Sequence, residues 1–369
     1  MFSPKYSITN VLLANIKRIN TLVNELNNRR FPHVVLLELE RTAREVSTYA
    51  STSIEGNPLP LTEVKKILKS KPAHIRESEK EVLNYNQALQ DLNELLRTSP
   101  SDEHSSPADK ELEEGRVKLS IELILKIQKQ VTDGLLPTFE SGHLRKQPVQ
   151  VKDPKTRQVK YLPPDIKDVE PLMRDLIEFI NSNRDKIDPL ILAGIFHKQM
   201  VLIHPFTDGN GRTTRLATKV LLAEMGLNTF DLFSFENYYN QNVTRYFERV
   251  GEFGNYYDLV SHGMNKFSSS KIEFTSWLEY FTEGIIDELL RVQKLLPVVA
   301  ISPDTKLQPY HLKMLDFIGE KGFITGIDYA KLSGRAKATR TKDFKKLTDL
   351  GLIERKGKGK ATYYALKEK

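Results

Sequence analysis

The segment that decides the fold is His204-Pro-Phe-Thr-Asp-Gly-Asn-Gly-Arg-Thr-Thr-Arg215, a short stretch in which charged side chains surround two glycines. The glycines on either side of Asn210 can turn the chain so that successive backbone N–H groups converge on one point. The periodicity of the next residues, 212–225, predicts a helix whose N-terminus faces the same point. The segment therefore predicts an anion cradle between two helices.

The charged side chains of this segment suit a chain of phosphates. Arg212 and Arg215 are three residues apart, so they share one helix face and can place two guanidinium groups on phosphate oxygens. Asp208 offers a hard oxygen ligand for Mg²⁺, and His204 offers a base that titrates near neutral pH. A Walker loop is excluded, because its Lys-Ser/Thr pair is missing and this loop joins two helices.

At these residues the chain resembles the Fic family, whose signature HPFx[D/E]GNGRxxR is matched at every specified position. Most Fic enzymes are adenylyltransferases that move AMP from ATP onto a Ser, Thr or Tyr hydroxyl of a protein. The resemblance implies that His204 deprotonates the target hydroxyl, which attacks the α-phosphorus in line with the departing pyrophosphate. It also implies that Asp208 holds the Mg²⁺ that bridges the α- and β-phosphates.

The same resemblance implies how the loop binds the nucleotide. The backbone of Gly209–Gly211 and the side chain of Asn210 would cradle the phosphates, while both arginines neutralise the β/γ end. Phe206 would be a buried anchor for the loop. The expected nucleotide-binding residues are Glu55, Val201, Gly209, Asn210, Gly211, Arg212, Thr213, Thr214, Arg215 and Phe247.

The adenine side of this site is less closely matched. Residues 235–247 resemble the family segment that closes over the adenine, and many relatives have two tyrosines where this chain has Tyr246 and Phe247. The change removes a hydroxyl and keeps an aromatic face for stacking. Core packing is the alternative role for one of the two rings. Val201, one turn before His204, is expected to form a wall of the nucleotide site.

A second motif lies on the N-terminal side of the loop. Residues 38–53 predict a helix that ends at the breaker Glu55-Gly-Asn-Pro58, and Ser51-Thr-Ser-Ile-Glu55-Gly56 matches the [S/T]xxxE[G/N] inhibitory motif of many Fic proteins. The resemblance implies that Glu55 pairs with Arg215 and occupies the guanidinium that the γ-phosphate would otherwise use. ATP would then bind badly or in an unproductive pose.

A helix is expected at residues 188–203, leading to His204, and the residues that precede it predict a β-hairpin. Val149–Pro164 contains two alternating arms around a Pro-Lys-Thr turn. Fic proteins use a flap at this place to dock the target segment by strand pairing, which reads backbone rather than side chains. The alternative is a surface hairpin without a role.

Composition limits the classes of protein that the chain can belong to. Its 369 residues are enough for two or three folded units, and the absence of cysteine excludes disulfides and thiolate metal sites. The N-terminus resembles no cleavable signal, and no run approaches the roughly 20 apolar residues of a membrane span. We therefore expect a cytoplasmic protein without a membrane partner, and a homodimer is compatible with the sequence.

The last residues predict a separate basic module. Helical patterns at 309–319, 326–332 and 337–350 precede a hairpin that ends in Lys356-Gly-Lys-Gly-Lys-Ala-Thr-Tyr-Tyr, an order that resembles a winged helix-turn-helix. Residues 335–369 contain 12 Lys or Arg and 4 Asp or Glu, whereas the whole chain has a net charge of +7. The excess charge is therefore concentrated here. The sequence leaves open whether the partner of this module is DNA or protein.

These observations predict a mainly α fold, with a Fic-type helical core, a β-hairpin flap and a small C-terminal winged helix-turn-helix module. We expect an N-terminal helical region with the inhibitory helix at 1–97, the catalytic core at 109–300 and the winged helix at 304–369. The expected function is autoinhibited AMP transfer from Mg²⁺-ATP to protein hydroxyls, the chain's own included. The alternatives are another transfer, such as phosphocholine or phosphate, removal of AMP with Glu55 orienting water, and a DNA-binding regulator whose core senses nucleotide.

Overall fold

The computed structural model describes most of the chain and divides it into two compact units. It describes residues 2–28, 33–70, 72, 74–97, 112–113, 116–152, 156, 158–223, 225–227, 233–260, 272–295, 307–350, 352–357 and 359–367, with the backbone alone at 33–38, 112, 113, 116, 295, 320 and 360. The first unit contains Met1–Leu26 and Ala43–Val292, and the second contains Asn27–Thr42 and Gln293–Lys369. The segment 43–97 thus belongs to the same unit as the catalytic loop.

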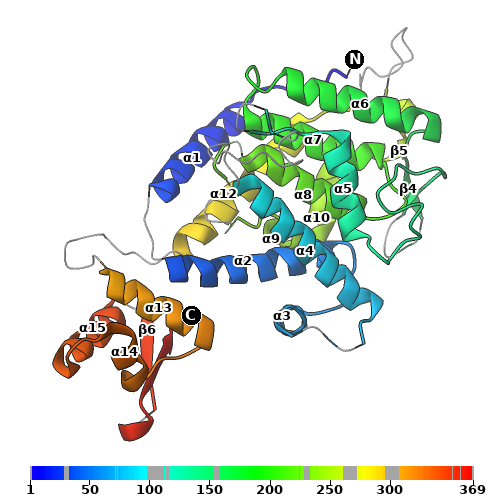
Figure 1. Ribbon diagram of the computed structural model, residues 1–369. Coiled ribbons are helices and arrows are strands. Elements are labelled where there is room, and N and C mark those ends of the chain that lie inside the picture. The colour runs from blue at the N-terminus through cyan, green and yellow to red at the C-terminus, as the bar shows by residue number, and fades with distance from the viewer. Residues whose placement is uncertain are drawn as a thin grey trace. The chain divides into compact units, whose positions relative to one another are not determined.

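The first unit is mainly helical, as the sequence predicts (Figure 1). Its helices are α1 (Asn10–Asn27), α2 (His33–Ile54), α3 (Leu61–Lys69), α4 (Glu77–Arg97), α5 (Ile121–Val131), α6 (Ile166–Ser182), α7 (Pro189–Ile203), α8 (Asn210–Ala223), α9 (Glu236–Gln241), α10 (Val243–Val250), α11 (Tyr256–Leu259) and α12 (Thr275–Leu295). The unit boundary falls within α2. Among the described helices, none combines the length and the apolar character that crossing a bilayer demands.

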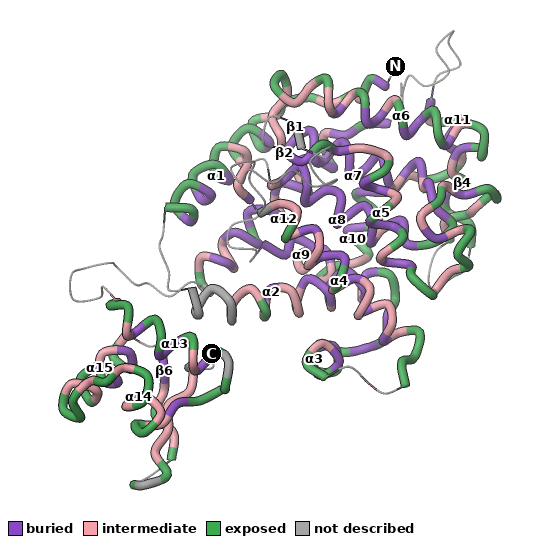
Figure 2. The backbone as a smooth tube through the Cα atoms, in the orientation of Figure 1, coloured by how far each residue is buried: buried purple, intermediate pink, exposed green. Residues whose placement is uncertain are grey.

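The centre of this unit is α7, the helix that ends at the catalytic loop. Its sequence is apolar on nearly every face, and nearly all of its residues are buried (Figure 2). The helix starts where Asp188 accepts a hydrogen bond from the Leu190 N–H and Pro189 occupies the first turn. It lies alongside α8, which is buried as completely. The core therefore fixes both helices that flank the loop.

A glycine allows α12 to lie close against α7. The indole Nε1 of Trp277 donates to the Gly194 carbonyl at 2.7 Å. A Cβ at Gly194 would lie 2.5 Å from a methyl group of Leu278, so a larger residue would require the Leu278 side chain to move within a packed core. The two residues of this contact are 83 positions apart in the chain, so no local pattern predicts it.

Short strands form the flap that the sequence predicts. β3 (Val151–Lys152) pairs antiparallel with β4 (Val159–Leu162), with Val151 opposite Tyr161. A third strand, β5 (Gly254–Asn255), pairs parallel with β4 and was not expected from the sequence. A separate two-stranded pair, β1 (Leu112–Glu113) and β2 (Arg116–Val117), is antiparallel. The hairpin is confirmed, and its docking role stays a prediction.

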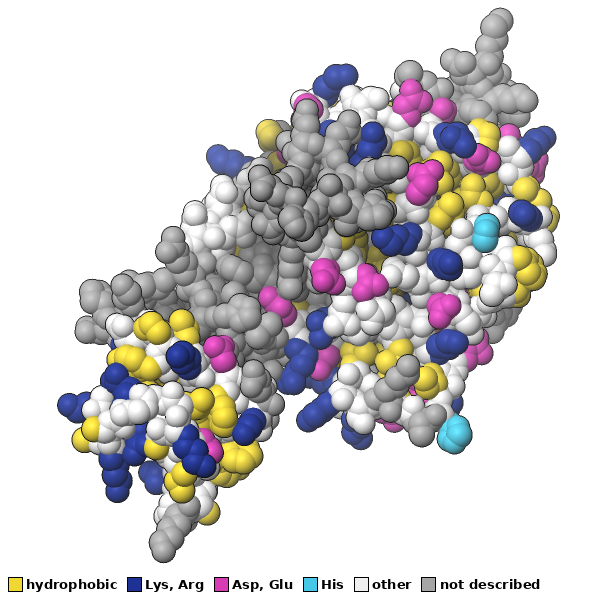
Figure 3. Space-filling view, in the orientation of Figure 1, with side chains coloured by type: hydrophobic (Ala, Val, Ile, Leu, Met, Phe, Trp, Pro, Cys, Tyr) yellow, Lys and Arg dark blue, Asp and Glu magenta, His cyan; other side chains and the backbone are white. Residues whose placement is uncertain are grey.

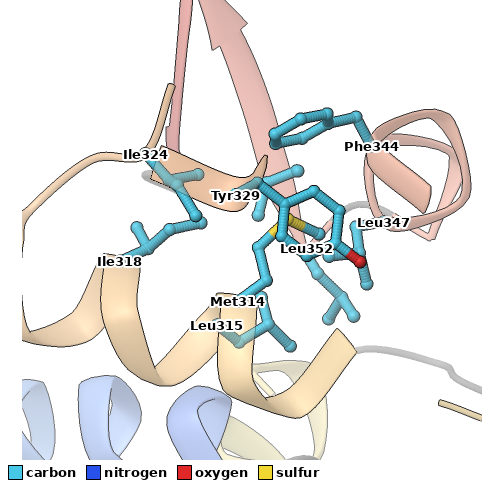
Figure 4. Packing of buried hydrophobic residues seen from close by; sticks show 9 residues of the cluster. Met314, Leu315, Ile318, Ile324, Tyr329, Phe344, Leu347 and Leu352 are labelled. Atoms are coloured by element: carbon cyan, nitrogen blue, oxygen red, sulfur yellow. The ribbon is translucent and has the colours of Figure 1, made fainter. Parts of the chain in front are cut away.

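The second unit has its own core. It contains α13 (Pro309–Lys321), α14 (Gly326–Ser333), α15 (Lys337–Asp349) and the antiparallel pair β6 (Ile353–Lys356) and β7 (Tyr363–Leu366). Figure 4 shows apolar side chains of α13 directed toward Tyr329, Phe344, Leu347 and Leu352. These elements follow the order that the sequence predicts, and their interpretation as a winged helix-turn-helix stays a prediction.

A buried carboxylate connects three elements of this unit. Asp343 accepts hydrogen bonds from the hydroxyl of Tyr329 at 2.8 Å and from Nε of Arg335 at 2.9 Å, and it lies 3.3 Å from Nε2 of His311. The visible surface of the unit carries both Lys/Arg and apolar side chains (Figure 3). Exposed apolar residues include Phe323 and Ile327.

Candidate active site

His204 ends α7 in a conformation that turns the chain into the loop. Its φ of 50° is the one positive value of a non-glycine residue within the described residues, and its N–H still closes the helix on the Met200 carbonyl at 3.0 Å. A left-handed residue costs free energy unless its surroundings hold it, and such strain is common at functional sites. The partners of this residue supply that support.

The imidazole of His204 is arranged to accept a proton. Its Nδ1 lies 3.2 Å from the carbonyl oxygen of Val201, which can only accept, so Nδ1 carries the hydrogen and Nε2 keeps a free lone pair. Burial lowers the pKa of His204 from its ordinary value of 6.5. The ring is therefore neutral at pH 7, which is the form a general base requires.

Arg145 holds the backbone of His204 and the base of the flap together. Its Nε donates to the His204 carbonyl at 2.9 Å, and its Nη2 donates to the Pro164 carbonyl just after β4. The N–H of Arg145 also donates to the Pro205 carbonyl at 2.9 Å. The hydroxyl of Tyr161 on β4 donates to the Leu202 carbonyl in the last turn of α7 at 3.0 Å. The flap and the end of α7 at His204 are thus joined through hydrogen bonds.

Asn210 holds the loop in shape through both polar atoms of its side chain. Its Oδ1 accepts from the Phe206 N–H and its Nδ2 donates to the Phe206 carbonyl, each at 2.9 Å. The resemblance to the Fic family predicts that this side chain contacts phosphates, whereas in the structure both of its polar atoms bind the Phe206 backbone. Phe206 itself is fully buried, as expected. Asn210 therefore acts on the cradle by fixing the backbone that forms it.

The first turn of α8 presents free backbone donors. Gly209 has a φ of 79°, and its carbonyl accepts the first helical hydrogen bond, from the Thr213 N–H at 2.9 Å. The N–H groups between these two residues precede any acceptor in the helix, so they remain available to an anion. The side chains of Thr213 and Thr214 are fully buried, and their contact with the nucleotide stays a prediction.

Arg215 is bound by the motif from the end of α2. Its Nη2 donates to Oε1 of Glu55 at 2.7 Å and to the Ser51 carbonyl at 2.8 Å, and its Nε donates to the Ser51 hydroxyl at 2.8 Å. Arg215 is fully buried. Burial lowers the pKa of Arg215, but the Glu55 carboxylate together with Tyr246 and Tyr85 outweighs this effect, so the pKa of Arg215 is raised. The structure thus brings together the two segments that the sequence expects to pair.

Gly211 leaves space for the Glu55 carboxylate. A Cβ at this position would lie 2.1 Å from Oε1 of Glu55 and 3.0 Å from Nη1 of Arg215. The Glu55 carboxylate therefore rests directly on the turn at Gly211.

Arg212 is held by two carboxylates. Its Nη2 donates to Oδ2 of Asp208 at 2.8 Å, and its Nη1 lies 2.5 Å from Oε1 of Glu81 on α4. The Arg212 side chain is 2% exposed, whereas the Asp208 side chain is 53% exposed. Both arginines of the loop are therefore already paired with acidic side chains.

The donor set at the loop fits Mg²⁺ only together with a phosphate ligand. In the described part of the chain, no group of three or more His, Cys, Asp or Glu could hold a metal ion. Asp208 is an exposed hard-oxygen donor beside the cradle. Mg²⁺ commonly uses one or two carboxylates together with substrate phosphates and water, so this single carboxylate is compatible with the ion.

The two aromatic residues expected near the adenine occupy different environments. Tyr246 is 1% exposed and stacks on Tyr239 with ring centroids 4.6 Å apart, and its hydroxyl lies 2.9 Å from Nε2 of the buried His197. Phe247 is 40% exposed. Tyr246 therefore belongs to the core, and only Phe247 offers a face to a ligand. Val201 is partly buried.

Comparisons with known proteins identify the loop. A sequence model of the Fic/DOC family matches residues 118–222, which include α5, the flap, α7 and α8. Residues 118–222 therefore form a Fic domain. The assignment agrees with the geometry of the His204–Arg215 segment and with the mainly helical fold.

Two relatives and one solved structure illustrate the similarity. The chain is 28% identical over 215 residues to the protein adenylyltransferase fic-1 of Caenorhabditis elegans, covering 57% of this chain and 38% of that protein. It is 30% identical over 198 residues to the protein adenylyltransferase Fic of Nematostella vectensis, covering 52% and 40%. A Fic family protein from Desulfovibrio desulfuricans G20 has the same fold, with a TM-score of 0.63, 19% identity and coverage of 100% and 99%. The chain spans about two fifths of the length of these two relatives.

Several residues of the site were missed by the sequence analysis. Arg145 lies in an irregular segment and Gln128, whose Nε2 donates to the Asp208 carbonyl at 3.2 Å, lies on a helix with no polar motif. Glu81 belongs to a helix with many charged residues, and nothing marks it among them. Asn57 directly follows the Glu-Gly pair of the inhibitory motif, which is the one local signal that could have indicated it.

Proposed function

We propose that this Fic protein is an autoinhibited adenylyltransferase that transfers AMP from Mg²⁺-ATP to Ser, Thr or Tyr hydroxyls of proteins, itself included. The observation that carries the proposal is the combination of a neutral, proton-accepting His204 with a phosphate cradle whose Arg215 is occupied by Glu55. The names of the relatives support the same reaction.

The chemistry follows from what the side chains can do. Nε2 of His204 accepts the proton of the target hydroxyl, and the hydroxyl oxygen forms a bond to the α-phosphorus. The bond between the α-phosphorus and the oxygen bridging to the β-phosphate breaks, and pyrophosphate departs with the electron pair. The protein contributes mainly positioning and charge stabilisation, through the N–H groups of the first turn of α8 and through Arg212 and Arg215. Asp208 would hold Mg²⁺, which neutralises phosphate charge when bound.

The flap is the proposed docking place for the target segment. β3 has one neighbour in its sheet, β4, among the described strands, so its other edge can accept an added strand. Because Tyr161 and Arg145 connect the flap to the end of α7, a strand docked there would lie near His204.

Regulation is proposed to operate through the γ-phosphate. Glu55 takes the Nη2 donor of Arg215 that the γ-phosphate needs, so ATP cannot take the pose that exposes its α-phosphorus. The Glu55 side chain is 28% exposed, which leaves a route for it to rotate away when inhibition is relieved.

The position of the label in ATP distinguishes the proposed reaction from the alternatives. The Glu55→Gly protein is incubated with ATP labelled at the α- or at the γ-phosphate, and protein-bound label is measured. AMP transfer predicts label from the α-position alone. Label from the γ-position alone would indicate phosphate transfer, and no label from either would contradict the proposal.

The second unit is proposed as a docking module for a DNA or protein partner. The net positive charge of residues 335–369, together with the exposed Lys337 and Lys342 on α15, favours a polyanion. The exposed Phe323 and Ile327 are features of a protein contact. Binding to duplex DNA at two salt concentrations separates these partners.

A further inference from the structure

Glu81 connects the phosphate loop to the end of the inhibitory segment. It lies in the second turn of α4, where Oε1 is 2.5 Å from Nη1 of Arg212 and Oε2 accepts from Nδ2 of Asn57 at 2.7 Å. Its side chain is 20% exposed. One carboxylate thus uses each of its oxygens for a different functional segment.

Asn57 is fixed firmly on α4 by this contact and by others. Its Nδ2 also donates to the Ser78 carbonyl at 2.9 Å, and its Oδ1 accepts from the Leu59 N–H at 3.1 Å. Gly56, with a φ of 94°, makes the turn between Glu55 and Asn57. The chain after the turn is therefore anchored on α4, and the Glu55 side chain can move while this anchor stays in place.

The two carboxylates that bind Arg212 differ in how freely each can leave it. Asp208 is 53% exposed, lies in the loop, and is the residue expected to turn toward Mg²⁺. Glu81 is on a helix that the core fixes, since the nearby Val82 and Tyr85 are fully buried and the Tyr85 hydroxyl donates to Glu236 at 2.8 Å. When a triphosphate draws Asp208 away, Glu81 remains as the partner of a guanidinium that is 2% exposed.

We propose that Glu81 is a positioning residue that holds Arg212 toward the β- and γ-phosphates in the active state as well as in the inhibited one. The proposal rests on the proposed function, because it assigns Arg212 to the phosphate grip. An arginine side chain has many rotamers, so fixing it in one of them costs conformational entropy. A fixed carboxylate that binds one edge of the guanidinium holds it in place and leaves the other edge directed at the ligand. Glu81 and Glu55 therefore have opposite effects on nucleotide binding. Glu81 supports it, whereas Glu55 blocks it.

The test compares variants of Glu81 in the Glu55→Gly background, so that inhibition does not mask the effect. Titration calorimetry measures the Kd of ATP and of AMP, which lacks the β- and γ-phosphates, and steady-state assays separate KM for ATP from kcat. We expect Glu81→Ala to weaken ATP binding about 10-fold, the lower end of the effect seen for partners that orient a ligating side chain in metal sites. AMP binding should stay unchanged. Glu81→Gln, which keeps an acceptor oxygen and loses the charge, should fall between.

Glu77→Gln is the matched control, because Glu77 is an exposed carboxylate one turn earlier on the same helix. In the Glu55→Gly background, the Glu77→Gln variant should have the same Kd for ATP as the Glu55→Gly protein. Equal or tighter ATP binding by Glu81→Ala would overturn the proposal, since it would mean that Glu81 only competes with phosphate for Arg212. An equal loss of ATP and AMP binding would also overturn it, since it would indicate general damage to the site.

The proposed function can fail separately. If the Glu55→Gly protein binds ATP but transfers no AMP, the proposed reaction is wrong, and Glu81 is still judged by the ratio of the ATP and AMP affinities. If the Glu55→Gly protein binds no ATP, both proposals are wrong.

Discussion

Replacing Glu55 with glycine tests how the inhibitory segment controls ATP binding. In the structure, Arg215 makes two hydrogen bonds to Ser51 and one to Glu55, all between 2.7 and 2.8 Å, and it is fully buried. The Glu55→Gly change removes the Glu55 side chain with its carboxylate and leaves the Ser51 contacts, which keep the guanidinium oriented. Because residue 55 follows the last residue of α2, glycine there does not interrupt the helix.

The size of the effect follows from the contact that becomes available. A hydrogen bond to a charged group contributes about 1.5–3 kcal/mol. Since about 1.4 kcal/mol corresponds to a factor of ten in Kd, the γ-phosphate should bind the freed Nη2 with a gain of roughly 10- to 100-fold for ATP. AMP has no γ-phosphate, so its affinity should change little.

Titration calorimetry of the wild-type and Glu55→Gly proteins with ATP and with AMP measures this difference directly. Glu55→Gln keeps an acceptor oxygen without the charge and should give an intermediate ATP affinity. Adding Arg215→Ala to Glu55→Gly should abolish the gain, because the same guanidinium is then missing from the grip. A Glu55→Gly protein that binds ATP no more tightly than wild type, or that gains equally for AMP, would refute the inhibition mechanism.

Three further predictions concern the base, the loop and the second unit. Burial lowers the pKa of His204 from 6.5, and a base must be neutral to accept a proton. The fall of kcat/KM on the acid side of the pH profile of the Glu55→Gly protein should therefore occur below pH 6.5. A fall above pH 6.5 would contradict the assignment. Gly211→Ala should lower the melting temperature more in wild type than in the Glu55→Gly protein, since the added Cβ lies 2.1 Å from Oε1 of Glu55; equal losses would show that this contact is unimportant. If the second unit binds DNA, gel-shift titrations should show an affinity for DNA that falls as the salt concentration rises. The double charge reversal Lys337→Glu and Lys342→Glu, at two exposed positions, should abolish this binding. Absence of DNA binding by the wild-type protein would favour a protein partner.

The helices and the local motif could be predicted because their signals are local. The mostly apolar run of residues 189–203 and the cap at Asp188 determine α7, and the signature from His204 to Arg215 is contained in one short segment. The Glu55–Arg215 pair is a long-range contact, and it was predicted only because two motifs of one family identify its ends.

Contacts between distant segments without a motif could not be predicted. Glu81 contacts Arg212 because α4 packs beside α8. Arg145 lies outside the regular elements and binds the His204 carbonyl. The strand β5 is only two residues long, so its own sequence does not predict a strand, and it forms because it pairs with β4. The side chain of Asn210 was assigned to phosphate because sequence does not reveal which polar group satisfies the Phe206 backbone.

The central claim is that His204 is the base of an AMP transfer that Glu55 restrains. The most direct measurement compares protein-bound label from α-labelled ATP in Glu55→Gly and in Glu55→Gly with His204→Ala, with ATP affinity measured in parallel. If His204 is the base, the two proteins should bind ATP with the same affinity, and the His204→Ala protein should lose about 10²- to 10⁴-fold in transfer, the usual contribution of a general base. Equal incorporation of label by the two proteins would contradict it.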